Sequence, residues 1–151
     1  IIRHMDEYSI FACEHKGYVA RINSTMAYFN ANKDMLNPET WAEMFMGANL
    51  IHTKTKDAAP VQYKDTSRVV NCLVANGCEI RGEVENSILF RDVKVGEGVK
   101  IKDCIIMEKC VIEDNAMLRN VICDKNVTVT KDQWLKGAEN YPLIVAKGTK
   151  I

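Results

Sequence analysis

A short motif recurs four times between residues 66 and 130, and this repeat strongly constrains how the 151-residue chain can fold. Successive copies start 15, 17 and 17 residues apart, at Asn71, Asn86, Asp103 and Asn120. Three apolar columns keep the same spacing: Val69, Val84, Ile101 and Leu118; Cys78, Val93, Cys110 and Val127; Ile80, Val95, Ile112 and Val129. Repetition at a fixed period indicates a solenoid, in which each repeat packs on its neighbours.

A finer period within each repeat indicates three short strands per turn. Apolar residues recur with gaps of 6, 6, 5, 6, 6, 5 and 6, at Leu89, Val95, Ile101, Ile106, Ile112, Leu118, Cys123 and Val129. A second, smaller apolar residue follows most of them by four positions: Val93, Val99, Cys110, Ala116 and Val127. This pattern predicts a mainly β fold, a parallel β-helix of hexapeptide repeats with about 17 residues per coil.

Both ends of the repeat depart from its period. Between Val74 and Leu89 the spacing shortens to 6, 4 and 5 around Gly77 and Gly82, which predicts a tightened corner in the first coil. Residues 131–151 contain Trp134 and an apolar run at 141–145, and we expect this tail to cap the end of the stack.

Residues 1–65 do not share the repeat and predict a small α+β segment. Residues 10–14 and 18–22 are spaced to pair as a hairpin. The pair at 23–24 predicts a helix cap, and Asn37 followed by Pro38 predicts a second one. We therefore divide the chain into a front segment with its linker, 1–57, and a β-helix domain with its C-terminal cap, 58–151.

Charge and cysteine usage exclude several classes of function. Twenty basic and twenty acidic residues cancel, which argues against nucleic acid or an anionic membrane as the main partner. No long apolar run or signal-peptide layout is present, so we expect a cytoplasmic protein. The six cysteines form no CxxC pair and none is adjacent to one of the three histidines, which predicts no metal site. Five of these cysteines fall in apolar columns and are expected to be buried thiols in a reducing compartment.

Two stretches of the sequence resemble a known enzyme family. Residues 17–24, 28–32 and 35–36 are similar to the segment that closes the catalytic domain of ADP-glucose pyrophosphorylases, which are glucose-1-phosphate adenylyltransferases. Residues 87–90 and the surrounding repeats resemble the C-terminal left-handed β-helix of that family. The resemblance implies that the front segment completes a nucleotidyltransferase domain whose nucleotide-binding part is absent from this chain. It also implies the reaction of the parent assembly, in which ATP and glucose 1-phosphate give ADP-glucose and pyrophosphate with magnesium.

Arg21 marks a departure from that family. It stands where the resemblance places an aspartate that helps hold magnesium. A guanidinium cannot ligate a cation, so the resemblance implies a lost metal-ligand position, no catalytic residue and no cofactor in this chain. The pattern is similar to the regulatory, GlgD-type subunit, which acts beside a catalytic subunit in glycogen biosynthesis. Two other interpretations of Arg21 stay open: a solvated strand residue in an unrelated segment, or a contact to phosphate in place of metal.

Other functions of hexapeptide-repeat proteins fit less well. Acyltransferases of this fold use a histidine base and zinc hydratases use three histidine ligands, yet residues 66–130 contain no histidine. A purely structural oligomerisation module is the remaining alternative. Phe90 and Met107 share a column, and we expect them either to form an apolar interface with a like or catalytic subunit or to pack on the front helices.

An effector site is also implied by the family, whose members bind phosphorylated sugars or nucleotides between the two domains. The basic residues that can serve such a site are Lys64, Arg68, Arg81 and Arg91. The surrounding glutamates make a solvated, mixed-charge surface the alternative interpretation of these residues.

Overall fold

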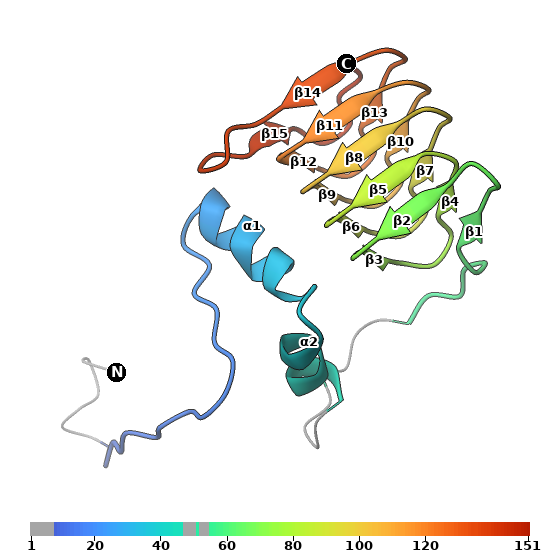
Figure 1. Cartoon of the computed structure of the whole chain (residues 1–151). Helices are drawn as coiled ribbons and strands as arrows, with labels where there is room; N and C mark the ends of the chain where they lie inside the picture. Colours follow the sequence, from blue (N-terminus) through green and yellow to red (C-terminus); the bar gives the residue numbers. More distant parts are fainter. Residues whose placement is uncertain (1–7, 47–50, 52–54) are drawn as a thin grey trace.

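The computed structural model describes residues 8–46, 51 and 55–151 and shows a left-handed parallel β-helix preceded by two helices (Figure 1). Three parallel sheets of five strands each form its sides. The first sheet contains β1 (Gln62–Tyr63), β4 (Glu79–Ile80), β7 (Lys94–Val95), β10 (Val111–Ile112) and β13 (Thr128–Val129). The second contains β2 (Arg68–Val70), β5 (Glu83–Glu85), β8 (Lys100–Lys102), β11 (Met117–Arg119) and β14 (Trp134–Lys136). The third contains β3 (Leu73–Val74), β6 (Ile88–Leu89), β9 (Ile105–Ile106), β12 (Val121–Cys123) and β15 (Leu143–Val145).

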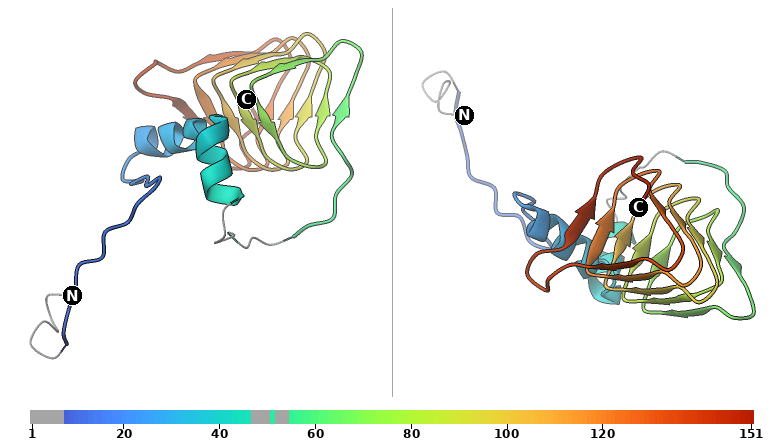
Figure 2. Two further views of the ribbon diagram at one scale, coloured as in Figure 1. Left: turned by 60° about the horizontal axis from the view of Figure 1, so that its bottom comes forward. Right: turned by 90° about the horizontal axis from the view of Figure 1, so that it is seen from above.

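The register of the strands confirms the predicted period. Gln62, Glu79, Lys94, Val111 and Thr128 lie side by side along the first sheet, so most coils advance by 17 residues and the second coil by 15. Figure 2 shows these stacked coils from two further directions. The shortened coil, which is the second in the structure and the first of the repeat counted from Asn71, contains the predicted tightened corner, because β4 ends only three residues before β5 begins.

The tail, which we expected to cap the stack, forms a further coil at its end. β14 and β15 continue the second and third sheets, and Lys150 forms a bridge beside Thr128. The physical reason is that aliphatic residues of the tail continue the interior columns: Leu135 packs on the core and Val145 is buried. The bulky Trp134, which the cap would need, is instead 72% exposed on the outer face.

The interior holds the predicted apolar columns, including most of the cysteines. Cys78, Cys104, Cys110 and Cys123 are fully buried, Cys72 is half-buried and Cys13 is exposed, and none forms a disulfide. Burial raises the pKa of the Cys104 thiol to about 12, because the thiolate would lose its hydration. These buried thiols are therefore packing residues in the protonated form, as the columns predicted.

The corners of the coils depend on residues that tolerate the left-handed backbone conformation. Asparagine and aspartate occupy most of these positions, since their short polar side chains lower the penalty that other L-residues meet. The corner that joins the second and third sheets carries Asn71, Asn86, Asp103 and Asn120, with φ between 47° and 52°. The recurring motif of the sequence is therefore the corner that begins each strand of the third sheet.

The front segment contains the two predicted helices. α1 (Thr25–Asp34) begins at Ser24, whose Oγ accepts a hydrogen bond from the Ala27 N–H at 3.0 Å. α2 (Pro38–Phe45) begins at Asn37, whose Oδ1 accepts from the Glu39 N–H at 2.9 Å. Both caps were predicted from the sequence. Neither helix in the described part of the chain is long and apolar enough to cross a membrane.

The predicted hairpin of residues 10–14 and 18–22 is wrong. Residues 8–23 form a single extended segment without a strand. Its contacts go to the helices instead, because the Tyr18 N–H donates to Glu43 Oε1 at 2.6 Å and its hydroxyl donates to Asp34 Oδ2 at 2.9 Å. A strand needs a paired neighbour to satisfy its backbone groups, and no described residue provides one here.

Candidate functional site

The face of the third sheet is where the front segment meets the β-helix (Figure 1). Phe29 of α1 is buried against Ile105 and Ile122, whose side chains point outward from β9 and β12. Partly buried side chains complete this cluster: Met26, Tyr28, Phe90 and Met107. Phe90 and Met107 therefore belong to the apolar cluster that contains Phe29 of α1, and a subunit interface at these two residues stays a prediction.

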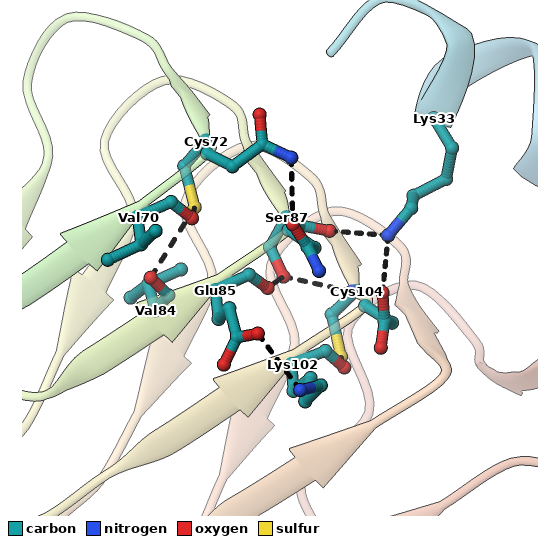
Figure 3. Close-up of polar contacts among 11 residues, drawn as sticks. Lys33, Val70, Cys72, Val84, Glu85, Ser87, Lys102 and Cys104 are labelled. Carbon is teal, nitrogen blue, oxygen red and sulfur yellow. Dashed lines mark hydrogen bonds and ion pairs between the residues drawn. The ribbon is translucent and has the colours of Figure 1, made fainter. Parts of the chain in front are cut away.

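A single lysine joins α1 to the corner of the β-helix next to this cluster (Figure 3). Lys33 Nζ lies 2.6 Å from Asp103 Oδ1 and donates to the carbonyl oxygen of Asn86 at 2.7 Å. The side chains of Lys33 and Asp103 are 23% and 25% exposed, so water screens this ion pair only in part. Ser87, which follows Asn86 in the chain, is fully buried, and both hydrogen-bonding roles of its hydroxyl are used. Its Oγ donates to the Glu85 carbonyl at 2.7 Å and accepts from the Cys104 N–H at 3.0 Å.

Sequence reasoning missed this contact, although one signal for it was present. Three of the four corner residues are asparagine and the fourth is Asp103, whose carboxylate carries a charge that an amide would not. A charge in a half-buried column requires a counter-ion, but nothing in the local pattern identifies Lys33 as that residue.

An apolar pocket of about 360 Å³ lies between α2 and the first coils of the third sheet. Its walls include Trp41, Phe45, Leu73, Ala75 and Phe90. The Trp41 and Phe45 rings are 6.0 Å apart and tilted by 45°. The pocket offers hydrophobic contact and little hydrogen bonding, so it suits packing against apolar side chains better than binding a phosphorylated ligand.

The structure brings together only two of the four basic residues considered for an effector. Lys64 and Arg81 line one shallow pocket of about 240 Å³, where Arg81 also approaches Glu97 at 3.8 Å. Arg68 lies on the outer face of the second sheet among Glu83, Glu85, Lys100 and Lys102. Arg91 lies at the corner after β6, where the pKa of Asp92 is lowered mainly by the Lys56 ammonium 2.7 Å away and to a smaller extent by Lys109 and Arg91.

The first sheet carries a larger groove of about 380 Å³ on its outer face. Three cations and three carboxylates line it: Arg81, Lys94, Lys131, Glu79, Glu113 and Asp114. The pair Lys94 and Glu79, at 3.7 Å, shows how these charges balance locally. A groove of mixed charge lacks the positive excess that would concentrate a phosphate, so the effector contacts stay a prediction.

Arg21 is exposed in the extended segment of residues 8–23. Magnesium binding needs carboxylate or phosphate oxygens, whereas this position presents a guanidinium. Within the described part of the chain, no cluster of three or more His, Cys, Asp or Glu residues is arranged to hold a metal. These residues do not fit the magnesium ion that the family resemblance implies.

Comparisons with known proteins agree with the fold and with the resemblance. The family model described as "GlmU-like, C-terminal hexapeptide" matches residues 57–137. The glycogen biosynthesis protein GlgD of Bacillus subtilis (strain 168) is 44% identical over 135 residues, which are 89% of this chain and 39% of that protein. GlgD of Geobacillus stearothermophilus is 43% identical over 119 residues, 79% of this chain and 35% of that protein.

A more distant relative is named for the enzyme activity. The glucose-1-phosphate adenylyltransferase of Acetivibrio thermocellus is 33% identical over 135 residues, 89% of this chain and 32% of that protein. The chain thus spans about two fifths or less of the length of these curated relatives. Because its repeat region, its three-sheet β-helix and the family model coincide, the chain belongs to the GlmU-like, C-terminal hexapeptide family, with GlgD and glucose-1-phosphate adenylyltransferases among its relatives.

Proposed function

We propose that this chain is the C-terminal part of a regulatory, non-catalytic GlgD-type subunit in glycogen biosynthesis. Its partner is a catalytic glucose-1-phosphate adenylyltransferase, which makes ADP-glucose and pyrophosphate from ATP and glucose 1-phosphate. One observation carries the proposal: over equal spans of 135 residues the chain is 44% identical to a GlgD and 33% identical to an adenylyltransferase.

The charge at Arg21 supports a non-catalytic role. A unit positive charge about 4 Å from a cation is repelled, and the energy is on the order of 4 kcal/mol per charge pair at an effective dielectric of about 20. A carboxylate at the same place would attract the ion by a similar amount. The exposed guanidinium of Arg21 therefore disfavours a metal at this position, and the residues that the structure describes supply no compensating carboxylate cluster.

The β-helix supplies a rigid support in this proposal. Its interior is filled by fully buried aliphatic and cysteine side chains, and its buried side-chain polar atoms all have hydrogen-bond partners within the described residues. Such a platform acts by holding subunits and the front segment in place. Six unpaired cysteines agree with a reducing, cytoplasmic location for the assembly.

The test is a titration of the catalytic subunit with the full-length protein, scored as ADP-glucose formation with and without phosphorylated-sugar and nucleotide effectors. We expect the full-length protein to have no activity alone and to change the rate or the effector response of the catalytic subunit. Arg21→Asp, with Arg21→Lys as the charge-conserving control, tests whether the guanidinium contributes to the loss of activity. Activity of the full-length protein alone at the rate of a catalytic subunit, or a titration without effect, would contradict the proposal.

A further inference from the structure

We infer that Lys33 is a positioning residue that sets the register of α1 on the β-helix and thereby couples the β-helix to the segment that carries Arg21. The ion pair of Lys33 with Asp103 at 2.6 Å, together with the hydrogen bond to the Asn86 carbonyl at 2.7 Å, selects one coil out of several similar ones. An effect of this docking on a catalytic subunit rests on the proposed function, whereas the contribution of the ion pair to holding α1 on the β-helix can be measured without it.

A β-helix presents nearly equivalent docking positions along its stack. The outward column of the third sheet is Leu73, Ile88, Ile105, Ile122 and Ile144, one aliphatic residue per coil. Adjacent strands are about 4.8 Å apart, so a helix that slides by one coil meets the same chemistry again. Apolar contact is non-directional and depends on buried area, and it does not discriminate strongly between such positions.

Asp103 breaks this equivalence. The corner column is Asn71, Asn86, Asp103 and Asn120, and all four adopt the left-handed conformation that asparagine and aspartate both tolerate. The Asn71 side-chain amide donates to Asn86 Oδ1 at 2.7 Å, a contact between neighbouring coils that asparagines can make along such a column. A carboxylate has no N–H to donate, so the corner itself gives no reason for aspartate in the third position. Lys33 gives that reason, because it neutralises the one charge in the column.

The position of Lys33 on α1 makes the ion pair directional. Lys33 is one helical turn after Phe29, so both side chains face the third sheet, one buried in the apolar cluster and one at the corner beside it. Three quarters of the Lys33 and Asp103 side-chain surface is shielded from water. A charge-assisted hydrogen bond in such a place is stronger and more sensitive to distance than one on an open surface.

The register of α1 passes directly to the residues on both sides of it. Arg21 lies three residues before the cap at Ser24, and α2 begins four residues after α1 ends. Tyr18 ties the extended segment to both helices through Asp34 and Glu43. A shift of α1 along the β-helix would therefore move Arg21 and the whole front segment relative to the solenoid.

The test compares Asp103→Asn, Lys33→Met and the double variant in the full-length protein. Asparagine suits the corner and methionine keeps an apolar stem, so each change removes the charge pair and leaves the apolar packing. Lys33→Met also removes the hydrogen bond to the Asn86 carbonyl. We expect hydrogen exchange of α1 amides to accelerate about tenfold in each single variant, since a ten-residue helix is marginal without tertiary contacts. The double variant should exchange no faster than the faster single variant, and Lys33→Arg should restore much of the protection.

A matched control is the more exposed pair Lys102 and Glu85 on the second sheet, at 2.9 Å, whose side chains are 45% and 39% exposed. Glu85→Gln should leave exchange in α1 unchanged. The second readout is the effector response of the catalytic subunit mixed with each variant, which Asp103→Asn should reduce and Glu85→Gln should not. Wild-type exchange rates in α1 of Asp103→Asn, or additive effects in the double variant, would overturn the inference. If the wild-type protein has no effect on the catalytic subunit, the proposed function fails, while the exchange data still decide whether the ion pair holds α1 on the β-helix.

Discussion

Alanine at Gly82 tests why the second coil can be two residues shorter than its neighbours. A Cβ atom built at Gly82 would lie 2.5 Å from the Val99 carbonyl oxygen and 2.9 Å from Val99 Cβ. That oxygen already accepts a hydrogen bond from the Glu83 N–H at 2.8 Å. The clash is therefore with backbone that cannot move without stretching a bond between adjacent coils.

The size of the effect follows from three opposing contributions. Overpacking in a tight interior destabilises a protein by about 1–3 kcal/mol, and a strained backbone hydrogen bond adds about 1 kcal/mol. Against these, alanine restricts the unfolded chain and stabilises by about 0.4–1 kcal/mol. We expect Gly82→Ala to lower the free energy of unfolding by about 1–3 kcal/mol.

Urea unfolding of the parent and the variant measures this change, and hydrogen exchange locates it in the second and third coils. Gly148→Ala is the control, because a Cβ there meets open space and only the left-handed backbone, with φ +72°, opposes it. We expect the control to cost about 1 kcal/mol and to leave exchange in the second coil unchanged. A gain in stability for Gly82→Ala, as at an ordinary glycine, would refute the steric explanation of the shortened corner.

Three further outcomes are expected. The free energy of unfolding should fall as the pH rises from about 9 to about 12, because the buried Cys104 thiol, with its pKa raised to about 12, keeps a proton that the unfolded chain releases. Cys104 contributes about 1.4 kcal/mol per pH unit to this slope, and Cys104→Val should reduce the slope by that amount in urea titrations at several pH values. An unchanged slope would contradict this assignment. Lys109→Asn should raise the free energy of unfolding by about 0.5–1 kcal/mol, because Lys109 has a left-handed φ of 59°, which asparagine tolerates better, in a column that also contains Asp92 and Asn126. A loss of stability would show that the contacts of the lysine side chain contribute more than the backbone strain costs. Phe29→Ala should release α1 from the third sheet, seen as loss of exchange protection in α1 with the β-helix unaffected, whereas retained protection would assign the docking to other contacts.

The sequence alone was sufficient to predict the β-helix because its information is local and repeated. Each core position, such as Ile101 or Leu118, recurs at a constant interval, and each coil packs mainly on its neighbours. The same columns identified the cysteines as packing residues and located the shortened corner. The caps at Ser24 and Asn37 were equally predictable, since a helix cap depends on a few adjacent residues.

Only the tertiary structure decided where the non-repeating parts go. The extended segment around Tyr18 has strand-like residues, but whether they pair depends on neighbours that local sequence does not specify. The tail forms a further coil because its aliphatic residues, such as Leu135 and Val145, continue the interior columns. The repeat in the sequence ends before the tail and does not show where the last coil ends. The contact of Lys33 with Asp103 joins residues 70 positions apart. The sequence shows one charged residue, Asp103, in a column of asparagines, but it does not identify Lys33 as the counter-ion. The packing of a repeat can be predicted because each coil contacts mainly the next one along the chain. The position of a helix on a repeating surface, in contrast, depends on a long-range contact that distinguishes one coil from the others.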